Sequence, residues 1–491
     1  MPAVAFLAFC GALPTHSATF QGTVKESLYL MGVDSVKVTL KGASGVAYTD
    51  TSGRFQLETG PSALRAGRAV RANVVWRAAA RAVEWTAGVG PVTVEIRDSK
   101  GTLIRRSESR GGEAGRLEVT PPGKGVYFAD VRAGGRRLAW QWWELEGSAG
   151  RAPGATRDAV YSLGGPSLAK SAAEGDTLIF ERRGFEMGRM AVGATSSGLE
   201  FKMKRTPIKL LIIDGASNHR WADMTKMLKV LLGKAGYFTV TVSTAPANGA
   251  SASSWEAWNP PIAENEIVLL NYNSGEFNGS QRWLRKQEQA LETFVSGGGG
   301  LYILHSANNG FPEWKEFNKM IGTGWRSSGF GTALEIGSDL KVIRIPAGTG
   351  TGTNHGRRID THINILNPHP IHKGYPKKYL TAILEIYYYA RGPAENCTVL
   401  SYAFDSPEAG GTRKNWPIEL MIDYGKGRVY NSTPGHLFNG EGTMPPAVKD
   451  ISWQTTVVRA SEWLARKEVF YPVPTPFNTE TKIEFRDIVL Q

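Results

Sequence analysis

The sequence predicts a multidomain chain in which an α/β domain follows N-terminal all-β sandwich domains. Three observations predict it. Up to residue 205 the chain alternates apolar and polar residues in short runs, as strands with one solvated face do. From residue 206 short apolar runs alternate with longer amphipathic segments, which is typical of parallel strands joined by helices. At 491 residues the chain is also longer than one ordinary domain.

The first 18 residues predict a secretory signal. An apolar stretch runs from Val4 to Leu13 and gives way to small and polar residues that end at Ala18. This arrangement is typical of a segment that is removed during export, so we expect a secreted or cell-surface protein. No other stretch reaches the roughly 18 apolar residues that a membrane-spanning helix needs, and we therefore predict no transmembrane segment.

Residues 19–205 are predicted to form the β-sandwich region. Apolar and polar residues alternate at residues 36–40 and 48–57, and an Asp-Thr-Ser-Gly turn at residues 50–53 divides the second run into two short strands, which predicts a hairpin. This part resembles the carboxypeptidase-regulatory-like β-sandwich of secreted proteins. The resemblance implies a spacer or adhesion element, which could attach the protein to a cell surface or a polysaccharide. A second alternating set at residues 88–145 is predicted to be a β-sandwich inserted into the first.

Charge and cysteine content exclude some partners and sites. The net charge is +12, with 28 Lys/Arg against 19 Asp/Glu in residues 1–205 and 29 against 26 in the remainder. Neither a basic stripe interleaved with aromatic residues nor a nucleic-acid motif accompanies this excess, so we expect a solvated surface and no nucleic-acid partner. The two cysteines, Cys10 and Cys397, are too few for a disulfide framework or a cysteine-based zinc site.

The α/β domain is predicted over residues 206–468, with a tail at residues 469–491. Its fourth strand is an apolar run that ends in His305 and Ser306. Because the strands of an open α/β sheet deliver side chains to a crevice at their carboxyl ends, we expect His305 to lie in that crevice. The predicted strands are 208–214, 238–242, 266–271 and 299–307, and the predicted helices are 222–235, 281–295 and 451–466.

Short polar patterns follow the fourth strand in a fixed order. They are His305-Ser306-Ala307, Trp314-Lys315-Glu316-Phe317, Trp325-Arg326, His369-Pro370-Ile371, Glu385 with Tyr387, and Pro434-Gly435-His436. This ordered set resembles the trehalose-utilisation (ThuA-like) family over about residues 206–468. The resemblance implies a flavodoxin-like sheet flanked by helices, similar to class I glutamine amidotransferases. It also implies a carbohydrate substrate, a trehalose-type disaccharide or its keto derivative.

In this resemblance His305, Glu385 and His436 match the recurrent polar positions of the family. Two chemistries stay open for such a set. The imidazoles and the carboxylate could move protons beside the carbonyl of a keto-sugar and at a leaving oxygen. The same three groups could instead bind a divalent metal such as zinc and leave a position open for substrate or water. A hydrogen-bonded structural role is the alternative for each of them.

Six further residues are candidates for substrate binding. Trp325 could stack on a sugar face, and Arg326 could clamp a hydroxyl or carboxylate or else form a surface ion pair. His355 lies in a glycine-rich loop, where either function or simple exposure is expected. On a strand, Tyr387 shares a face with Glu385. The six candidates are Ser306, Asn308, Trp325, Arg326, His355 and Tyr387.

Two functions are compatible with these residues. One is a secreted sugar-active enzyme, and the other is a non-catalytic carbohydrate-binding protein of the cell surface. The retained His and Glu positions favour the enzyme, by analogy with the family. Glutamine hydrolysis is not expected, because it needs a thiolate on the turn after the fourth strand. The chain has His305 and Ser306 there, and Cys397 lies far along the sequence.

Overall fold

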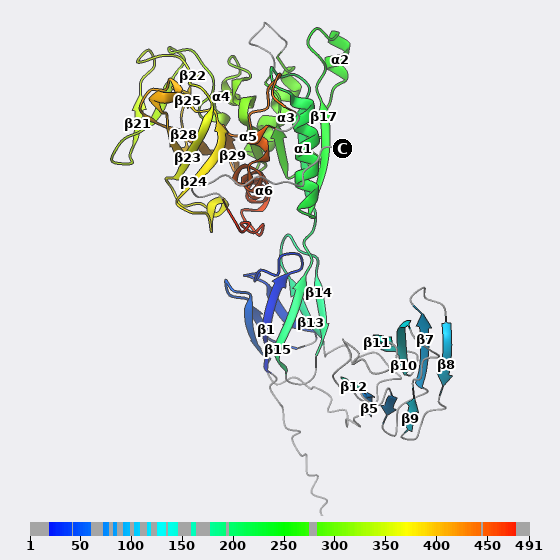
Figure 1. Ribbon diagram of the computed structural model, residues 1–491. Helices are drawn as coiled ribbons and strands as arrows, with labels where there is room; N and C mark the ends of the chain where they lie inside the picture. Colours follow the sequence, from blue (N-terminus) through cyan, green and yellow to red (C-terminus); the bar gives the residue numbers. More distant parts are fainter. Residues whose placement is uncertain are drawn as a thin grey trace, which may run out of the picture. The chain divides into compact units, whose positions relative to one another are not determined.

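The computed structural model describes residues 19–41, 43–59, 177–192, 196–273, 282–442 and 445–477, together with the strands between residues 72 and 163. The predicted signal segment and the tail from residue 478 lie outside the described residues. The chain divides into two compact units (Figure 1). As far as they are described, the first comprises Met1–Val24, Val33–Glu181 and Met187–Phe201, and the second comprises Lys25–Gly32, Arg182–Glu186 and Lys202–Gln491.

The first unit contains a β-sandwich. One of its sheets has the strand order β15-β1-β4, and the other has the order β14-β13-β2-β3. The rings of Phe55 in β4 and Phe180 in β13 lie 5.9 Å apart, so the two sheets pack face to face through buried aromatic side chains. The strands are β1 Thr19–Glu26, β2 Lys37–Leu40, β3 Val46–Tyr48, β4 Arg54–Glu58, β13 Thr177–Glu181, β14 Gly188–Ala191 and β15 Ser196–Met203.

Eight further strands lie between β4 and β13 in the sequence. They form two four-stranded sheets, with the orders β11-β10-β7-β8 and β12-β5-β6-β9. This β-rich stretch is longer than the insertion predicted at residues 88–145, whose exact limits stay a prediction. The strands are β5 Ala72–Arg77, β6 Ala82–Trp85, β7 Val92–Asp98, β8 Leu103–Glu108, β9 Gly115–Glu118, β10 Gly125–Ala133, β11 Arg136–Leu145 and β12 Ala159–Leu163.

The second unit is built on a large mixed sheet whose first half is parallel. The parallel strands have the order β17-β16-β18-β19-β29. Parallel neighbours need a crossover connection, and helices supply it between the first four of these strands in the sequence. The elements are β16 Ile208–Asp214, α1 Trp221–Lys234, β17 Phe238–Thr244, α2 Ala252–Ala257, η2 Ile262–Glu264, β18 Ile267–Leu270, α3 Arg285–Ser296, β19 Gly300–Leu304, η4 His305–Asn309, α4 Lys315–Ile321, β29 Gly427–Ser432, α5 Pro446–Lys449 and α6 Ile451–Arg466.

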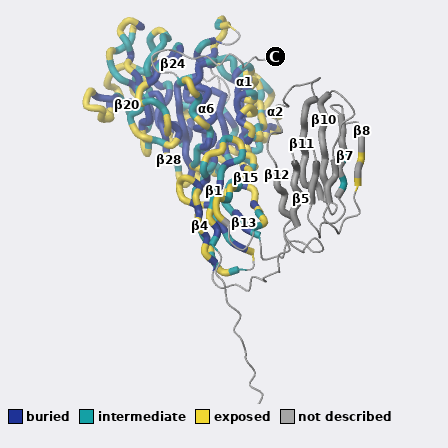
Figure 2. Tube along the Cα trace, turned by 60° about the horizontal axis from the view of Figure 1, so that its bottom comes forward, coloured by how far each residue is buried: buried dark blue, intermediate teal, exposed yellow. Residues whose placement is uncertain are grey.

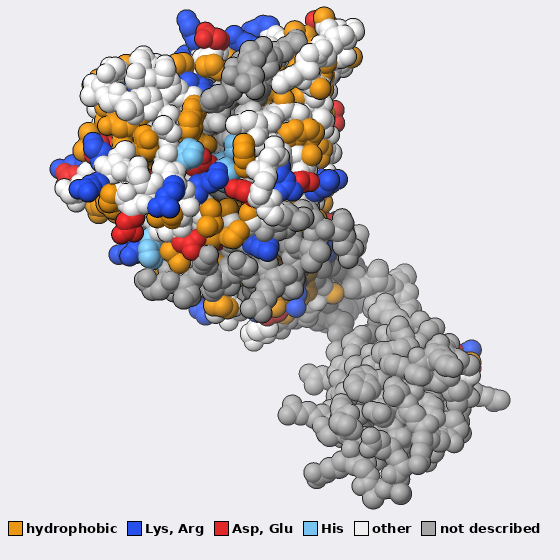
Figure 3. Space-filling view, turned by 45° about the horizontal axis from the view of Figure 1, so that its top comes forward, with side chains coloured by type: hydrophobic (Ala, Val, Ile, Leu, Met, Phe, Trp, Pro, Cys, Tyr) orange, Lys and Arg blue, Asp and Glu red, His pale blue; other side chains and the backbone are white. Residues whose placement is uncertain are grey.

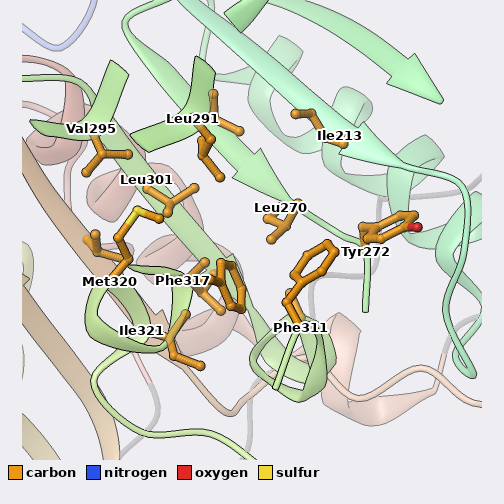
Figure 4. Close-up of a cluster of buried hydrophobic side chains, with 14 of the residues drawn as sticks. Ile213, Leu270, Tyr272, Leu291, Val295, Leu301, Phe311, Phe317, Met320 and Ile321 are labelled. Carbon is orange, nitrogen blue, oxygen red and sulfur yellow. The ribbon is translucent and has the colours of Figure 1, made fainter. Parts of the chain in front are cut away.

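Both faces of the parallel half are buried (Figure 2). Successive strand residues point to opposite faces. Leu270 therefore belongs to a cluster with Leu291 of α3 and Phe317 of α4 (Figure 4). Its neighbour Leu269 belongs to the opposite cluster, which α1 and α6 cover and which includes Val457. Because these strands are parallel, their carboxyl ends lie at one edge of the sheet, and the polar side chains that follow them gather there.

Beyond β29 the sheet continues with antiparallel strands, and the predicted parallel sheet is wrong for this half. The order continues as β29-β28-β27-β23-β24. β28 and β29 are joined through Gly425 and Lys426 alone, a connection too short for a crossover helix. The elements are β20 Thr332–Ile336, β21 Val342–Ile345, β22 Asn354–His355, β23 Ile359–Ile365, η5 Pro370–His372, β24 Lys378–Leu384, β25 Tyr387–Tyr388, β26 Arg391–Gly392, β27 Cys397–Phe404, η6 Pro407–Ala409 and β28 Asn415–Tyr424.

The described part of the C-terminal tail packs against the second unit. Phe470 is buried, and the ring of Phe477 lies 4.5 Å from that of Tyr375. Among the helices of the described residues, none combines the length and the hydrophobicity that crossing a membrane requires.

Candidate metal centre and active site

Three histidines reach one site from the carboxyl ends of parallel strands. His219 follows β16, His305 follows β19 as the first residue of η4, and His436 follows β29. The ring centroids lie 4.9 Å apart for His219 and His305, 4.9 Å for His219 and His436, and 5.1 Å for His305 and His436. The ring planes are nearly perpendicular to one another. Three imidazoles that are far apart in the sequence therefore converge because their strands share one sheet edge.

A carboxylate joins them from the antiparallel half. Glu385 follows β24, and its Oε2 lies 3.3 Å from Nε2 of His305 and 3.6 Å from Nε2 of His436. The nearest ligand atoms of His219, His305, Glu385 and His436 all lie within 4.8 Å of one another, and we call these four residues the His/Glu cluster. The structure thus brings together the three predicted residues and adds His219.

Each imidazole of the cluster has its Nδ1 bound to an oxygen. Nδ1 of His305 donates to the backbone carbonyl of Thr433 at 2.5 Å. Nδ1 of His436 lies 3.0 Å from Oε1 of Glu441. Nδ1 of His219 lies 2.8 Å from Oδ1 of Asn218. Because an oxygen acceptor fixes the proton on Nδ1, the Nε2 lone pairs of His219 and His305 are left to face the cluster. Nε2 of His436 also contacts Nη1 of Arg358.

The backbone at His305 is strained. Its φ is 43°, in the left-handed region that residues other than glycine seldom adopt. Such a conformation costs on the order of 1–3 kcal/mol and persists only where the surroundings impose it. Arg326 supplies part of that support, because its guanidinium donates to the carbonyls of Asn309 at 3.0 Å and Gly310 at 2.7 Å. The strained turn directs the His305 ring into the cluster.

Burial and charge set the protonation of the cluster. Burial would raise the pKa of Glu385, but the neighbouring imidazoles of His305 and His355 outweigh it and hold this pKa well below its usual range. Burial, followed by the charge of His305, lowers the pKa of His219 to about 3 and that of His436 to about 2. At neutral pH the cluster therefore presents a carboxylate beside neutral imidazoles of His219 and His436, the forms that bind a metal.

The donor set fits a divalent cation. Glu385 Oε2 is buried and has no hydrogen-bond partner among the described residues, although it faces two imidazole nitrogens. A buried carboxylate oxygen without a donor is costly, and a cation in the cluster would satisfy it. Imidazole nitrogens and carboxylate oxygens are the ligands that zinc and similar metals prefer, and oxygen acceptors on Nδ1 are the usual outer support of such ligands.

Aromatic side chains surround the cluster. The half-buried Trp325 ring lies 5.9 Å from the ring of His355 and 5.1 Å from that of Tyr387. Tyr387 is buried, with its ring 5.9 Å from that of His305. Phe438 is 36% exposed and stacks against His436 at 5.8 Å. Figure 3 shows histidine, basic and acidic side chains close together on one face of the C-terminal unit. Trp325 and Phe438 are placed to offer apolar surface beside the polar centre.

His355 connects the cluster to solvent. Its Nε2 lies 2.8 Å from Oε1 of Glu385, and its Nδ1 lies 2.6 Å from the carbonyl of Gly356. Both acceptors are oxygens, so the ring donates to both when it carries two protons. The hydrogen bond to Glu385 raises the pKa of His355 and outweighs the opposing effect of burial.

The structure corrects the prediction for Arg326. The residue is buried, and besides the carbonyls of η4 its Nε donates to Oδ1 of Asn318 at 3.0 Å. A guanidinium engaged in this way supports the loop that carries His305 and is not a substrate clamp.

Ser306 and Asn308 are also buried, and the amide of Asn308 donates to Oδ1 of Asn431 at 3.2 Å. Substrate binding by Ser306 and Asn308 stays a prediction.

Sequence reasoning missed three residues of the site. His219 carries the same signal as His305, a polar residue just beyond the carboxyl end of a buried strand. Arg358 and Glu441 carry no comparable signal. Arg358 Nη1 lies 3.1 Å from Nδ1 of His436, and its Nη2 lies 3.5 Å from Oε1 of Glu441. Their place beside His436 depends on contacts that no local pattern indicates.

The fold and the site define an α/β protein with a histidine–carboxylate centre at the carboxyl edge of its sheet. Residues 209–443 match the model of the ThuA family, described as trehalose utilisation. The crystal structure of a protein assigned as ThuA-like from Parabacteroides merdae ATCC 43184 is 30% identical and has a TM-score of 0.52. The match covers 57% of this chain and 98% of that one. The chain therefore belongs to the ThuA family, and this membership suggests a role in trehalose utilisation.

More distant solved structures include a β-galactosidase from Bacillus circulans sp. alkalophilus, which is 11% identical with a TM-score of 0.28 over 52% of this chain and 31% of that one. The glutaminase domain of Trypanosoma brucei CTPS is 8% identical with a TM-score of 0.31 over 56% of this chain and 100% of that one. Both scores are low, so these likenesses bear on neither the fold nor the chemistry of this chain. No curated protein matches the chain.

Proposed function

We propose that the C-terminal domain is a metal-dependent enzyme that processes a glycoside or keto-glycoside of the trehalose type. The observation that carries the proposal is the convergence of three imidazoles and one unpartnered carboxylate oxygen in the His/Glu cluster. We propose further that the protein is secreted and that its β-sandwiches attach it to a cell surface or polysaccharide. The strand order of the parallel half, 2-1-3-4-5 in sequence order, supports a flavodoxin-like domain.

In this proposal the four residues of the cluster bind the metal. A divalent cation there would supply Lewis-acid polarisation of a sugar oxygen. His355 holds the second oxygen of Glu385 and keeps the carboxylate turned toward the cluster. Trp325 offers an apolar face on which a sugar ring can stack. Arg358 stands beside His436 as a donor for a substrate oxygen.

The environment of the described cysteine supports the exclusion of glutamine hydrolysis. Cys397 lies in β27 and packs against the hydrophobic core, and burial raises the pKa of its thiol. A thiol with a raised pKa is a poor source of the thiolate nucleophile that amide hydrolysis would need.

Metal analysis combined with turnover tests the proposal. The purified protein should contain one equivalent of a divalent metal and should convert 3-keto-glycosides or related disaccharides, with products identified by mass spectrometry. His305→Ala and Glu385→Gln should lower turnover by at least about 100-fold while the circular dichroism spectrum is kept. Glu335→Gln is a matched control, since Glu335 pairs with Lys414 at 2.6 Å and lies outside the cluster.

The same experiment distinguishes a sugar-active enzyme from a non-catalytic carbohydrate-binding protein. Undiminished turnover in both cluster variants would remove the site assignment. Sugar binding with no product and no bound metal would favour the carbohydrate-binding alternative.

A further inference from the structure

A hollow beside the His/Glu cluster has the size of a sugar-binding site. Its volume is about 730 Å³, within the range of roughly 300–1,000 Å³ that is usual for small-molecule pockets. His355, Arg357, Arg358, Ala409, Gly410 and Glu441 line it, and we call it the arginine hollow.

The arginine hollow adjoins the His/Glu cluster, because two residues of its lining contact cluster residues. His355 lines the hollow and lies 2.8 Å from Oε1 of Glu385. Glu441 lines it as well and lies 3.0 Å from Nδ1 of His436. A molecule in the hollow is therefore separated from the cluster by no more than one side chain, and the hollow suits the part of a substrate that flanks the reacting group.

Positive charge exceeds negative charge in the lining. Arg357 is exposed, and its Nη2 donates to the backbone carbonyl of Glu408 at 2.6 Å, a partner that carries no formal charge. Arg358 shares its charge with Glu441 across 3.5 Å. Glu441 is the one carboxylate in the lining, against the two guanidinium groups. A bound cation in the cluster would add to this excess.

One wall of the arginine hollow carries little side-chain bulk. Ala409 and Gly410 form it, and a Cβ built on Gly410 would meet open space. Gly356 packs tightly against this wall, since a Cβ there would lie 2.7 Å from the carbonyl of Ala409. The backbone amide of Arg357 donates to the same carbonyl at 2.7 Å. This contact fixes the backbone from which both arginine side chains project.

We propose that the arginine hollow binds an anionic substituent of the sugar substrate, a carboxylate or a phosphate ester, on the guanidinium of Arg357 beside Arg358. The inference rests on the proposed function and names its substrate class. Guanidinium groups bind carboxylate and phosphate through paired N–H donors, which explains why arginine rather than lysine stands at this position. Arg357 is thus a specificity-determining residue that selects acidic sugars over neutral ones.

Calorimetric titration of the full-length protein with glucuronate, glucose 6-phosphate and glucose tests the proposal. At least one acidic sugar should bind about tenfold or more tightly than glucose, as expected when a charge-assisted bond is added. Whether glucuronate or glucose 6-phosphate binds better identifies the anion. Arg357→Ala should abolish the preference, and Arg357→Lys should keep part of it, mainly for phosphate. Lys341→Ala is the control, since Lys341 is exposed on the hairpin between β20 and β21 and does not line the hollow, and it should leave the preference for acidic sugars unchanged.

Equal binding of acidic and neutral sugars would overturn the proposal, as would no binding of any of the three sugars or a preference that survives in Arg357→Ala. Repeating the titration with Glu385→Gln tests the preference for acidic sugars independently of the proposed reaction. If the anion preference persists in a variant without turnover, the hollow is supported independently. If Glu385→Gln keeps full turnover, the proposed function fails while the binding result stands.

Discussion

At the scale of single residues, the three cluster imidazoles owe their orientation to three different kinds of acceptor. Thr433 offers a backbone carbonyl, Asn218 an amide oxygen, and Glu441 a carboxylate. A charged acceptor increases the basicity of the imidazole it holds more than a neutral one does. Glu441 should therefore be the outer residue on which metal affinity depends most.

We expect Glu441→Ala to weaken metal binding by about 10–100-fold, because the His436 ring loses the acceptor that fixes its tautomer. Glu441→Gln should lie between Ala and the native residue, since an amide oxygen still accepts without the charge. Competition with a chromophoric chelator measures the affinity. Glu335→Ala removes a carboxylate outside the cluster and should have no effect. Native affinity in Glu441→Ala would show that His436 needs no outer partner.

At the scale of elements, α6 depends on a buried cap. Asp450 precedes the helix, and its Oδ1 accepts from the amide of Ser452 at 2.8 Å and from that of Trp453 at 3.3 Å. Its Oδ2 accepts from the amide of Ala382 in β24 at 2.9 Å. One carboxylate thus satisfies the start of the helix and joins it to the strand that leads to Glu385.

Replacing this cap should destabilise the protein. We expect Asp450→Ala to lower the free energy of unfolding by about 2 kcal/mol, since an N-cap is lost and the buried amide of Ala382 is left without its acceptor. Asp450→Asn keeps an acceptor and should cost less. Urea denaturation measures the change, and Asp339→Ala at an exposed turn is the control. Equal stability of Asp450→Ala and the native protein would contradict the role of the cap.

The elements also show what the sequence could predict. The strand at residues 208–214 and the helix at residues 451–466 agree with β16 and α6 residue for residue, because buried apolar runs and amphipathic periodicity are local signals. The direction of the strands that follow β19 is not local, since it depends on which distant strand each one pairs with. Glu385 could be named from motif order, but the positive φ of Ile383, two residues before it, gave no sequence signal.

The strand-face argument made for Glu385 and Tyr387 meets the same limit two residues further on, at Tyr389. Tyr387 lies beside His305, whereas the ring of Tyr389 packs 4.7 Å from that of Trp416 in a separate core. The chain bends between them, because Tyr389 has a φ of 51°. A side-chain alternation that assumes an unbroken strand fails at such a bend.

At the scale of the whole molecule, the cluster forms only when the sheet is complete. His219 follows the first strand of the domain and His436 the last, and Glu385 comes from the antiparallel half. Unfolding separates all four ligands, so a metal that binds the cluster should bind the folded chain far better than the unfolded one. Stability and metal binding are therefore linked.

Metal should stabilise the protein by mass action. At a free zinc concentration of 100 times Kd, the free energy of unfolding should rise by about 2.7 kcal/mol, provided that the unfolded chain does not bind it. The melting temperature should rise with zinc, and a chelator should reverse the rise. Glu385→Gln should lose most of the effect. A melting temperature that zinc leaves unchanged would contradict a metal site in the cluster.

Acid should destabilise the fold through His369, a histidine outside the His/Glu cluster. Burial, followed by the charge of His372, lowers the pKa of His369 to about 4 from its ordinary value near 6.5. Between these two values the unfolded chain takes up a proton that the folded chain refuses. The free energy of unfolding therefore falls as the pH decreases from about 7 to about 4, and the contribution of His369 is constant above that window.

Glu419 acts in the same direction at lower pH. Its burial would raise its pKa, but His372, Ser401 and Tyr430 together lower it. The stability that this carboxylate contributes is present above its unfolded pKa and is lost as the pH falls through its folded one. Both groups therefore lower the free energy of unfolding as the pH falls, and His369 is responsible for the loss at the higher pH values.

His369→Asn separates the two contributions. The asparagine cannot titrate in this range, and its oxygen can replace the ring nitrogen that accepts from the amide of Ile371 at the start of η5. We expect the variant to show a shallower loss of unfolding free energy between pH 7 and pH 4, measured by urea denaturation at half-unit steps. At pH 8 His369 is neutral in both folded and unfolded states, so the difference between variant and native protein there measures the packing change alone. An identical slope in the two proteins would mean that the His369 ring is protonated as readily in the folded state as in the unfolded one.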